Sequence, residues 1–156
     1  MLILGHAGIT ALVASMLFLP ALAAIFGALL PDIIDKGLFL IGWFPCTRFL
    51  AHTIFFFPIA GLATYAITRN KKVAVAVSLG VIFHLIEDLN SDIPLFYPFK
   101  QYSFIDTCAF GIQLTPYIVI SEIIGGLLLI YIFGFSKRFL NFRSKFWKYF
   151  RRRFSE

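Results

Sequence analysis

The residues of this chain that can carry chemistry occur in pairs with helical spacing. The members of each pair stand three or four residues apart, which on an α-helix places both side chains on one face of one turn. Neutral imidazoles and carboxylates are the ligands that Zn²⁺ or Mn²⁺ takes at hydrolytic sites with an open coordination position. The pairs are Asp32 with Asp35, Arg48 with His52, and His84 with Asp88. The sequence therefore predicts a divalent-metal site wherever the fold brings these pairs together.

All three histidines of the chain would belong to such a site. We expect one or two ions, zinc or manganese, held by a set of candidate ligands: His6, Asp32, Asp35, His52, His84 and Asp88. One of Asp32 and Asp35 would bridge, and the other would act as general base. A network of structural ion pairs is the alternative, since ionisable side chains at membrane depth also join helices to one another.

Two cations next to the candidate ligands bear on the substrate. Arg48 precedes His52 by one turn, and Lys36 follows Asp32 by one turn. A cation beside a metal site suits an anionic substrate such as a phosphoester, and we take Arg48 as a candidate catalytic residue together with the two aspartates. Ordinary contact with lipid headgroups is the alternative explanation for both cations.

The composition places these residues in a membrane protein. Of 156 residues, 60% are hydrophobic and 14% are charged, whereas a soluble domain is typically about 25% charged. Residues 49–67, 73–89 and 116–135 have little or no charge over lengths near those needed to cross a hydrocarbon core of ~30 Å. We predict an all-α integral membrane protein in which these segments are three spanning helices. Residues 90–115 contain two prolines and many aromatic side chains, which indicates an interfacial loop.

The distribution of basic residues predicts the topology. Eleven of the fourteen lie in the loop 68–72 or in the tail 136–156, and positively charged segments stay in the cytoplasm. We therefore expect a multi-pass protein of the cytoplasmic membrane, with a membrane domain over residues 1–135, its polar site at the outer face, and a cytoplasmic C-terminus. The tail spaces phenylalanines at helical intervals between basic residues, which predicts an interfacial amphipathic helix that binds anionic lipid headgroups. Nucleic acid is not expected as a partner.

The first thirty residues decide whether His6 can join the site. In one continuous helix, His6 and Asp32 would lie about 39 Å apart. A reversal near Pro20 would bring them together as a re-entrant hairpin with arms of about 12–14 residues, too short to span the bilayer. A single kinked helix is the alternative. Ala21-Leu22-Ala23 also has the form of a signal-peptidase site, but no basic residue precedes the apolar stretch.

Four blocks of the sequence resemble a known family. They are GH at residues 5–6, LLPDIIDK at 29–36, RFLAHT at 48–53, and HLIED at 84–88 followed by PLFYP at 94–98. In this order they resemble the LexA-binding, inner-membrane-associated, metal-dependent hydrolase family. More distantly, the order His, Pro-Asp, His and His-x-x-x-Asp is similar to zinc-dependent phospholipase C, an all-helical phosphodiesterase with a zinc cluster. The resemblance implies that His6, Asp32 or Asp35, His52, His84 and Asp88 bind metal. The phospholipases have further histidine ligands that this chain lacks, which limits the expectation to one or two ions.

Two functions follow from these patterns. The first is a membrane-embedded metal-dependent hydrolase that acts on a phosphoester or another ester, including a lipid ester, at the membrane surface. The second is a non-catalytic scaffold whose polar cluster ties helices together and whose basic tail binds partners or anionic lipid. Glu122, inside an apolar segment, is either a partner of the metal site or a bond to a neighbouring helix. Cys46 and Cys108 both fall in predicted outer loops, where a disulfide persists, but the sequence does not show that they meet.

Overall fold

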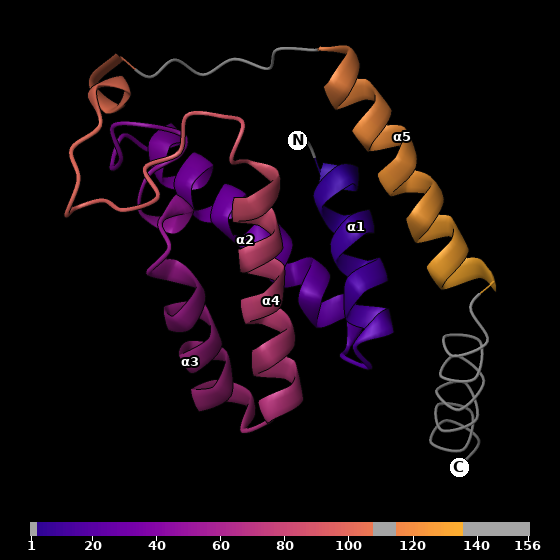
Figure 1. Cartoon of the computed structure of the whole chain (residues 1–156). Helices are drawn as coiled ribbons and strands as arrows, with labels where there is room; N and C mark the ends of the chain where they lie inside the picture. The colour runs from indigo at the N-terminus through magenta and orange to yellow at the C-terminus, as the bar shows by residue number, and fades with distance from the viewer. Residues whose placement is uncertain (1–2, 108–114, 136–156) are drawn as a thin grey trace.

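The computed structural model describes residues 3–107 and 115–135, and this part of the chain is helical and contains no strand. Its α-helices are α1 (Ile3–Met16), α2 (Ala21–Leu40), α3 (Phe56–Thr68), α4 (Lys71–Glu87) and α5 (Pro116–Ile130). Short turns complete it: the 3-10 helices η1 (Leu50–His52) and η2 (Ser103–Thr107), and the π-helix η3 (Tyr131–Phe135). In Figure 1, α4 lies between α3 and α1, and α5 is outermost beside α1. The predicted all-α class is confirmed.

The predicted reversal near Pro20 is present. After Met16, the backbone N–H of Leu19 donates to the carbonyl of Ala14 at 2.9 Å, and Phe18 adopts a left-handed conformation with φ of 59°. Helices commonly end in this way, with a left-handed residue after the last turn and a following N–H that bonds a carbonyl five residues earlier. Pro20 then fixes its own φ at −67° and starts α2. The apolar start of the chain is therefore a helical hairpin and not one continuous helix.

The second arm of the hairpin is longer than predicted. We expected about 12–14 residues, whereas α2 has 20 and continues through Pro31 to Leu40. A proline inside a helix removes one hydrogen bond and its ring crowds the carbonyl four residues earlier, which kinks a helix without always ending it. One turn later, Lys36 Nζ and Asp32 Oδ2 form an i,i+4 ion pair at 2.6 Å, which supports the continuing helix.

The prediction of a single helix over residues 49–67 was wrong. The α-helix starts only at Phe56 and has 13 residues, or about 20 Å of length. Before it, the backbone bonds elsewhere: the N–H of Phe49 and of Ala51 donate to the carboxylate of Asp35, and the N–H of Ile54 donates to the carbonyl of Leu95 at 2.8 Å. These long-range bonds replace the helical ones, so His52 lies on η1 and not in a span.

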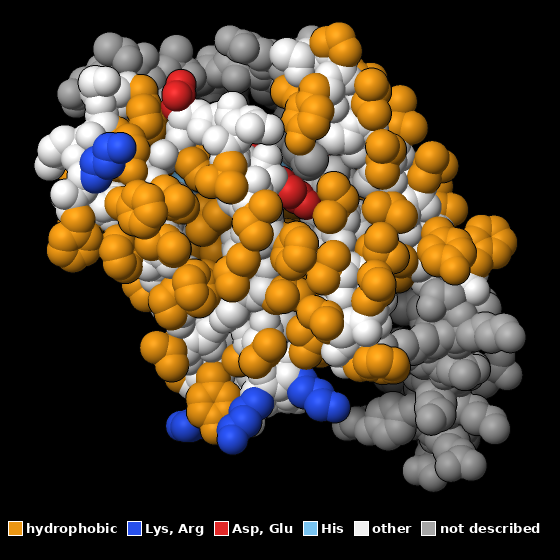
Figure 2. All heavy atoms as spheres, in the orientation of Figure 1, with side chains coloured by type: hydrophobic (Ala, Val, Ile, Leu, Met, Phe, Trp, Pro, Cys, Tyr) orange, Lys and Arg blue, Asp and Glu red, His pale blue; other side chains and the backbone are white. Residues whose placement is uncertain are grey.

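One helix in the described residues is long and apolar enough to cross a bilayer, namely Pro116–Phe135, formed by α5 and η3. Ile3–Met16 and Phe56–Thr68 are apolar but shorter, so three full spans are not confirmed. The face in Figure 2 is nevertheless covered mainly by hydrophobic side chains, and most of the basic side chains visible on it lie at its lower end. The irregular loop predicted after residue 90 is confirmed as far as residue 107, with only η2 regular there. The amphipathic tail lies outside the described residues.

Two pairs of helices meet backbone to backbone. A Cβ added at Gly27 on α2 would overlap the carbonyl of Val77 on α4. A Cβ added at Gly80 on α4 would overlap the carbonyl of Ala24 on α2. Between α1 and α5, Gly8 faces the backbone of Gly125 in the same way. Small residues allow this approach, which is how helices pack when lipid competes equally for apolar side chains.

Gly27→Ala should destabilise the protein by roughly 1–3 kcal/mol, because the new methyl group would meet the backbone of α4, which cannot move aside independently of its helix. Gly37→Ala is the matched control on α2, since no atom lies within 4 Å of its added Cβ. It should be neutral or stabilise by up to about 1 kcal/mol through helix propensity. Thermal unfolding followed by circular dichroism in detergent measures both. Equal melting temperatures for the two variants would contradict the close approach of α2 and α4.

Candidate metal centre

The three histidines, predicted to meet, are in contact. The ring of His6 from α1 stacks on the ring of His84 from α4 with centroids 4.2 Å apart, and the ring of His52 from η1 stands edge-on to His84 at 5.0 Å. The Nε2 atoms of His52 and His84 are 3.1 Å apart. All three residues have no exposed surface. Three separate elements thus deliver three imidazoles to one buried point.

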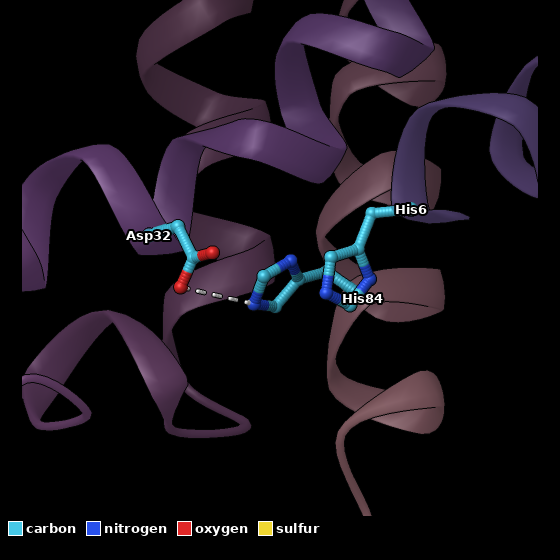
Figure 3. A group of neighbouring side chains, drawn as sticks. All are labelled: His6, Asp32 and His84. Carbon is cyan, nitrogen blue, oxygen red and sulfur yellow. Dashed lines mark ion pairs between the residues drawn. The ribbon is translucent and has the colours of Figure 1, made fainter. Parts of the chain in front are cut away.

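Two carboxylates join this point. Asp32 Oδ1 lies 3.5 Å from His52 Nε2 and 3.9 Å from His84 Nε2. Asp88, the C-cap of α4, lies 3.6 Å from His6 Nε2 and 3.9 Å from His84 Nε2. Two groups of three residues each bring their potential ligand atoms within 4.8 Å of one another. The first group is His6, Asp32 and His84, and the second is His52, His84 and Asp88. Figure 3 shows the first set, with Asp32 reaching from α2 toward His84.

Asp35 lies on the Nδ1 side of the His52 ring, opposite the Nε2 atom that faces His84. One of its oxygens is 2.7 Å from His52 Nδ1, and its carboxylate accepts the N–H groups of Phe49 and Ala51 at 2.6 and 3.0 Å. Asp35 belongs to neither set of converging ligand atoms. Its contacts are those of a residue that holds η1 and fixes the ring of His52.

Glu87, which pairs with His6, is not among the residues predicted for the site from the sequence. The carboxylate of Glu87 bonds His6 Nδ1, and both side chains are almost fully buried. The available signal was a second carboxylate next to Asp88, three residues after His84, in an otherwise apolar helix end. Glu87 plays toward His6 the part that Asp35 plays toward His52.

These two carboxylates orient the imidazoles. A ring that donates Nδ1–H to a carboxylate keeps a lone pair on Nε2, which is how carboxylates orient metal-binding histidines. His6 Nε2 is buried and has no hydrogen-bond partner among the described residues. Burying an acceptor without a partner is costly. A divalent cation between the Nε2 atoms and the carboxylates of Asp32 and Asp88 would satisfy it, so the donor set fits a metal.

Neighbouring charges shift the pKa values of two of these groups, His52 and Asp88. Burial disfavours the charged form of His52, but the hydrogen bonds and charges of Asp32 and Asp35 outweigh it and raise its pKa above the usual value. Burial acts against ionised Asp88 as well, but the nearby charges of His6 and Arg48 lower its pKa below the usual value. Asp88 is therefore a carboxylate at neutral pH. The raised pKa of His52 favours its protonated form, which competes with a metal, so metal binding should weaken as the pH falls.

The two predicted cations lie on the accessible side of the cluster. Lys36 pairs with Asp32 at 2.6 Å, and Arg48 Nε lies 3.3 Å from Asp88 Oδ2. Their side chains are 37% and 31% exposed, and Asp32 is 14% exposed, whereas the histidines are enclosed. A ligand from solution or from the membrane surface would therefore approach past Lys36, Arg48 and Asp32.

Glu122 holds the helix that carries His6. Its carboxylate, on α5, accepts the N–H groups of Leu4 and Gly5 at 2.8 and 2.9 Å. The first N–H groups of a helix have no partner within the helix. Of the alternatives for Glu122, the structure supports a bond to a neighbouring helix, one residue away from His6.

Cys46 is buried and disulfide-bonded. It lies in the segment between α2 and η1, close in sequence to Arg48 and His52. Cys108 lies outside the described residues.

The described residues form helices and no strand, one helix among them is long and apolar enough to cross a membrane, and histidines and carboxylates meet in a buried centre. These features are those of a membrane protein with a candidate metal centre. The family model described as YdjM inner membrane protein matches residues 1–147, and the chain belongs to this family. Its location in the inner membrane, expected from composition, is supported by the family. The family description states no activity, so the hydrolase resemblance remains a prediction. No curated protein and no solved structure matches the chain.

Glu122→Leu should destabilise the protein by about 1–3 kcal/mol for each N–H left without an acceptor. Glu122→Gln keeps one acceptor oxygen and should lose roughly half as much. Thermal unfolding in detergent gives the stability, and hydrogen exchange of the Leu4 and Gly5 amides gives the local effect. If those amides exchange equally fast in wild type and Glu122→Leu, the carboxylate does not hold α1.

Proposed function

We propose that this protein is a metal-dependent hydrolase of the inner membrane that cleaves a phosphoester or another ester at the membrane surface. The observation that carries the proposal is the orientation of the imidazoles. His6 and His52 each direct Nδ1 to a buried carboxylate, and their Nε2 atoms face His84, Asp32 and Asp88. Carboxylate partners of this kind orient metal-binding histidines.

The proposed ligands are His6, His52, His84 and Asp88, together with Asp32. Imidazole and carboxylate without thiolate suits Zn²⁺ or Mn²⁺. When bound, such an ion would lower the pKa of a water molecule to near neutrality and polarise the ester oxygen. His84 belongs to both sets of converging atoms, which favours one shared ion over two independent ones.

Two aspartates that the sequence left interchangeable take different roles in this proposal. Asp35 has three donors on its carboxylate, so it positions His52. Asp32 pairs with Lys36 at 2.6 Å, lies 3.5 Å from His52 Nε2 and is partly exposed. Asp32 would therefore be the aspartate that ligates the ion or accepts the proton of the attacking water.

The substrate class follows from the cations on the open side. Arg48 and Lys36 place two positive charges beside the carboxylates of Asp88 and Asp32. A phosphate oxygen would replace the carboxylates in these ion pairs, because guanidinium and ammonium groups bind phosphate with charge-assisted bonds. Arg48 and Lys36, and not the metal ion alone, would then select an anionic ester as the substrate.

A second function is supported by the same contacts. The cluster links α1, α2, η1 and α4 directly, so a purely structural network would hold the bundle together without any reaction. The protein would then be a scaffold with a basic tail. Metal content and hydrolysis separate the two functions.

Purified wild-type protein, loaded with Zn²⁺ or Mn²⁺, should contain one or two metal equivalents by elemental analysis. His84→Gln should lose at least one, because His84 belongs to both sets of ligand atoms. Asp35→Asn should keep the stoichiometry but weaken metal affinity roughly 10- to 100-fold, since it loosens the orientation of His52. Lys100→Gln is the control, an exposed charge outside the cluster.

Hydrolysis of phosphomonoester, phosphodiester and phospholipid substrates is measured on the same samples. Metal bound at the cluster without hydrolysis of any of them would support the scaffold. No metal in wild type after loading with both ions would remove the metal site itself.

The site is proposed to face the outer side of the membrane, with the loop between α3 and α4 and the C-terminus in the cytoplasm. The charge distribution supports this orientation. The disulfide at Cys46, near the site in sequence, is consistent with an oxidising compartment.

Labelling with a membrane-impermeant thiol reagent in intact cells tests the orientation. A cysteine at Ser103 should react, and one at Asn70, the exposed N-cap of α4, should react only after the membrane is opened. Both positions are exposed, so neither is protected by burial. The opposite pattern would place the site in the cytoplasm.

A further inference from the structure

An apolar groove lies at the end of the bundle away from the metal centre. It has a volume of about 410 Å³ and is formed by α2, α3 and α4, with lining residues that include Leu22, Phe26, Thr64, Ile67, Val73 and Val77. The lining residues nearest to the proposed ligands are Val77, seven residues before His84 on α4, and Phe26, six residues before Asp32 on α2, or about 10 and 9 Å along the helices. The groove is therefore separate from the proposed reaction.

The groove offers almost no polar partner to water. Its two hydroxyl groups are used within α3: Thr64 donates to the carbonyl of Ala60 at 2.7 Å, and Thr68 donates to the carbonyl of Thr64 at 2.8 Å. A cavity holds ordered water only where several polar groups can bind it. The rim is also apolar and open, since Ile67 is 83% exposed and Phe26 is 55% exposed. The chemistry of the groove suits a hydrocarbon chain.

Three cations stand at the end of this groove. Arg69 directly follows Thr68, and Lys71 and Lys72 directly precede Val73. All three are exposed, and none forms an ion pair with a residue of 3–107 or 115–135. Figure 2 shows basic side chains at the lower end of the molecule, where Figure 1 places the connection between α3 and α4.

We propose that this groove binds an anionic phospholipid, with an acyl chain between α2, α3 and α4 and the headgroup phosphate at Arg69, Lys71 and Lys72. The apolar walls provide the energy of burial, and the cations select the charge of the headgroup. The apolar part of the groove thus binds the acyl chain, and the three cations bind the headgroup phosphate of the same lipid.

The basic tail of the chain is a poorer occupant. Residues 136–156 carry eight Lys and Arg side chains, and these would face three more at the groove. Like charges at close range oppose binding. Charge complementarity therefore favours an anionic lipid over this segment.

Native mass spectrometry of the full chain tests the proposal, with phosphatidylglycerol and phosphatidylcholine of identical acyl chains as probes. Wild type should bind one phosphatidylglycerol at least about tenfold more tightly than phosphatidylcholine. The triple variant Arg69→Gln, Lys71→Gln, Lys72→Gln should lose this preference. Val73→Phe should weaken both lipids by filling the groove, whereas Val75→Phe, at an exposed position of α4 outside the groove, should change neither.

Equal binding of the two lipids to wild type would overturn the proposal. A preference that survives in the triple variant would assign it to the tail instead, and equal affinities in Val73→Phe and wild type would exclude the groove. The three cations are exposed, so the triple variant keeps the fold and gives an answer even where Val73→Phe fails to accumulate.

Discussion

The burial of three imidazoles and their carboxylate partners is the constraint on which the rest of this structure depends. Ionisable groups inside a membrane protein are costly unless other polar groups surround them. Here the partners come from α1, α2, η1 and α4, so no single helix can satisfy its own histidine. His6, for example, needs Glu87 from α4, and His52 needs Asp35 from α2. The hairpin of α1 and α2 and the irregular segment before α3 are the backbone paths that allow these meetings.

These paths have backbone groups outside regular helices, which lipid cannot satisfy. The segment before α3 resolves this by bonding to Asp35 and to the carbonyl of Leu95. The same carboxylate that orients His52 thus also satisfies the backbone next to it. Close contacts at Gly27 and Gly80 bring α2 and α4 together.

The apolar helix α5 stabilises the site from outside. Most of its side chains face away from the bundle, yet Glu122 bonds the start of α1, and Gly125 lets the two helices touch. A substitution in α5 that shifts Glu122 or Gly125 would therefore shift the start of α1 and, with it, the position of His6. At the other end of the bundle, apolar surface and basic charge meet at the groove. The groove thus lies near the starts of α2 and α4, whereas the polar centre lies at the middle of α2 and the end of α4.

The sequence by itself determined the helical class through its apolar composition, and it predicted the reversal at Pro20 and the meeting of the His and Asp pairs from a proline and from helical spacing. The structure chose the reversal over a single kinked helix. The sequence predicted all six candidate ligands near one point, and five of them belong to the converging sets. Only the tertiary structure decided that α3 begins at Phe56, that Asp35 holds His52 from behind, and that Glu87 is the partner of His6. These features depend on hydrogen bonds between residues far apart in the chain, and such bonds leave no periodic pattern in the sequence that could predict them.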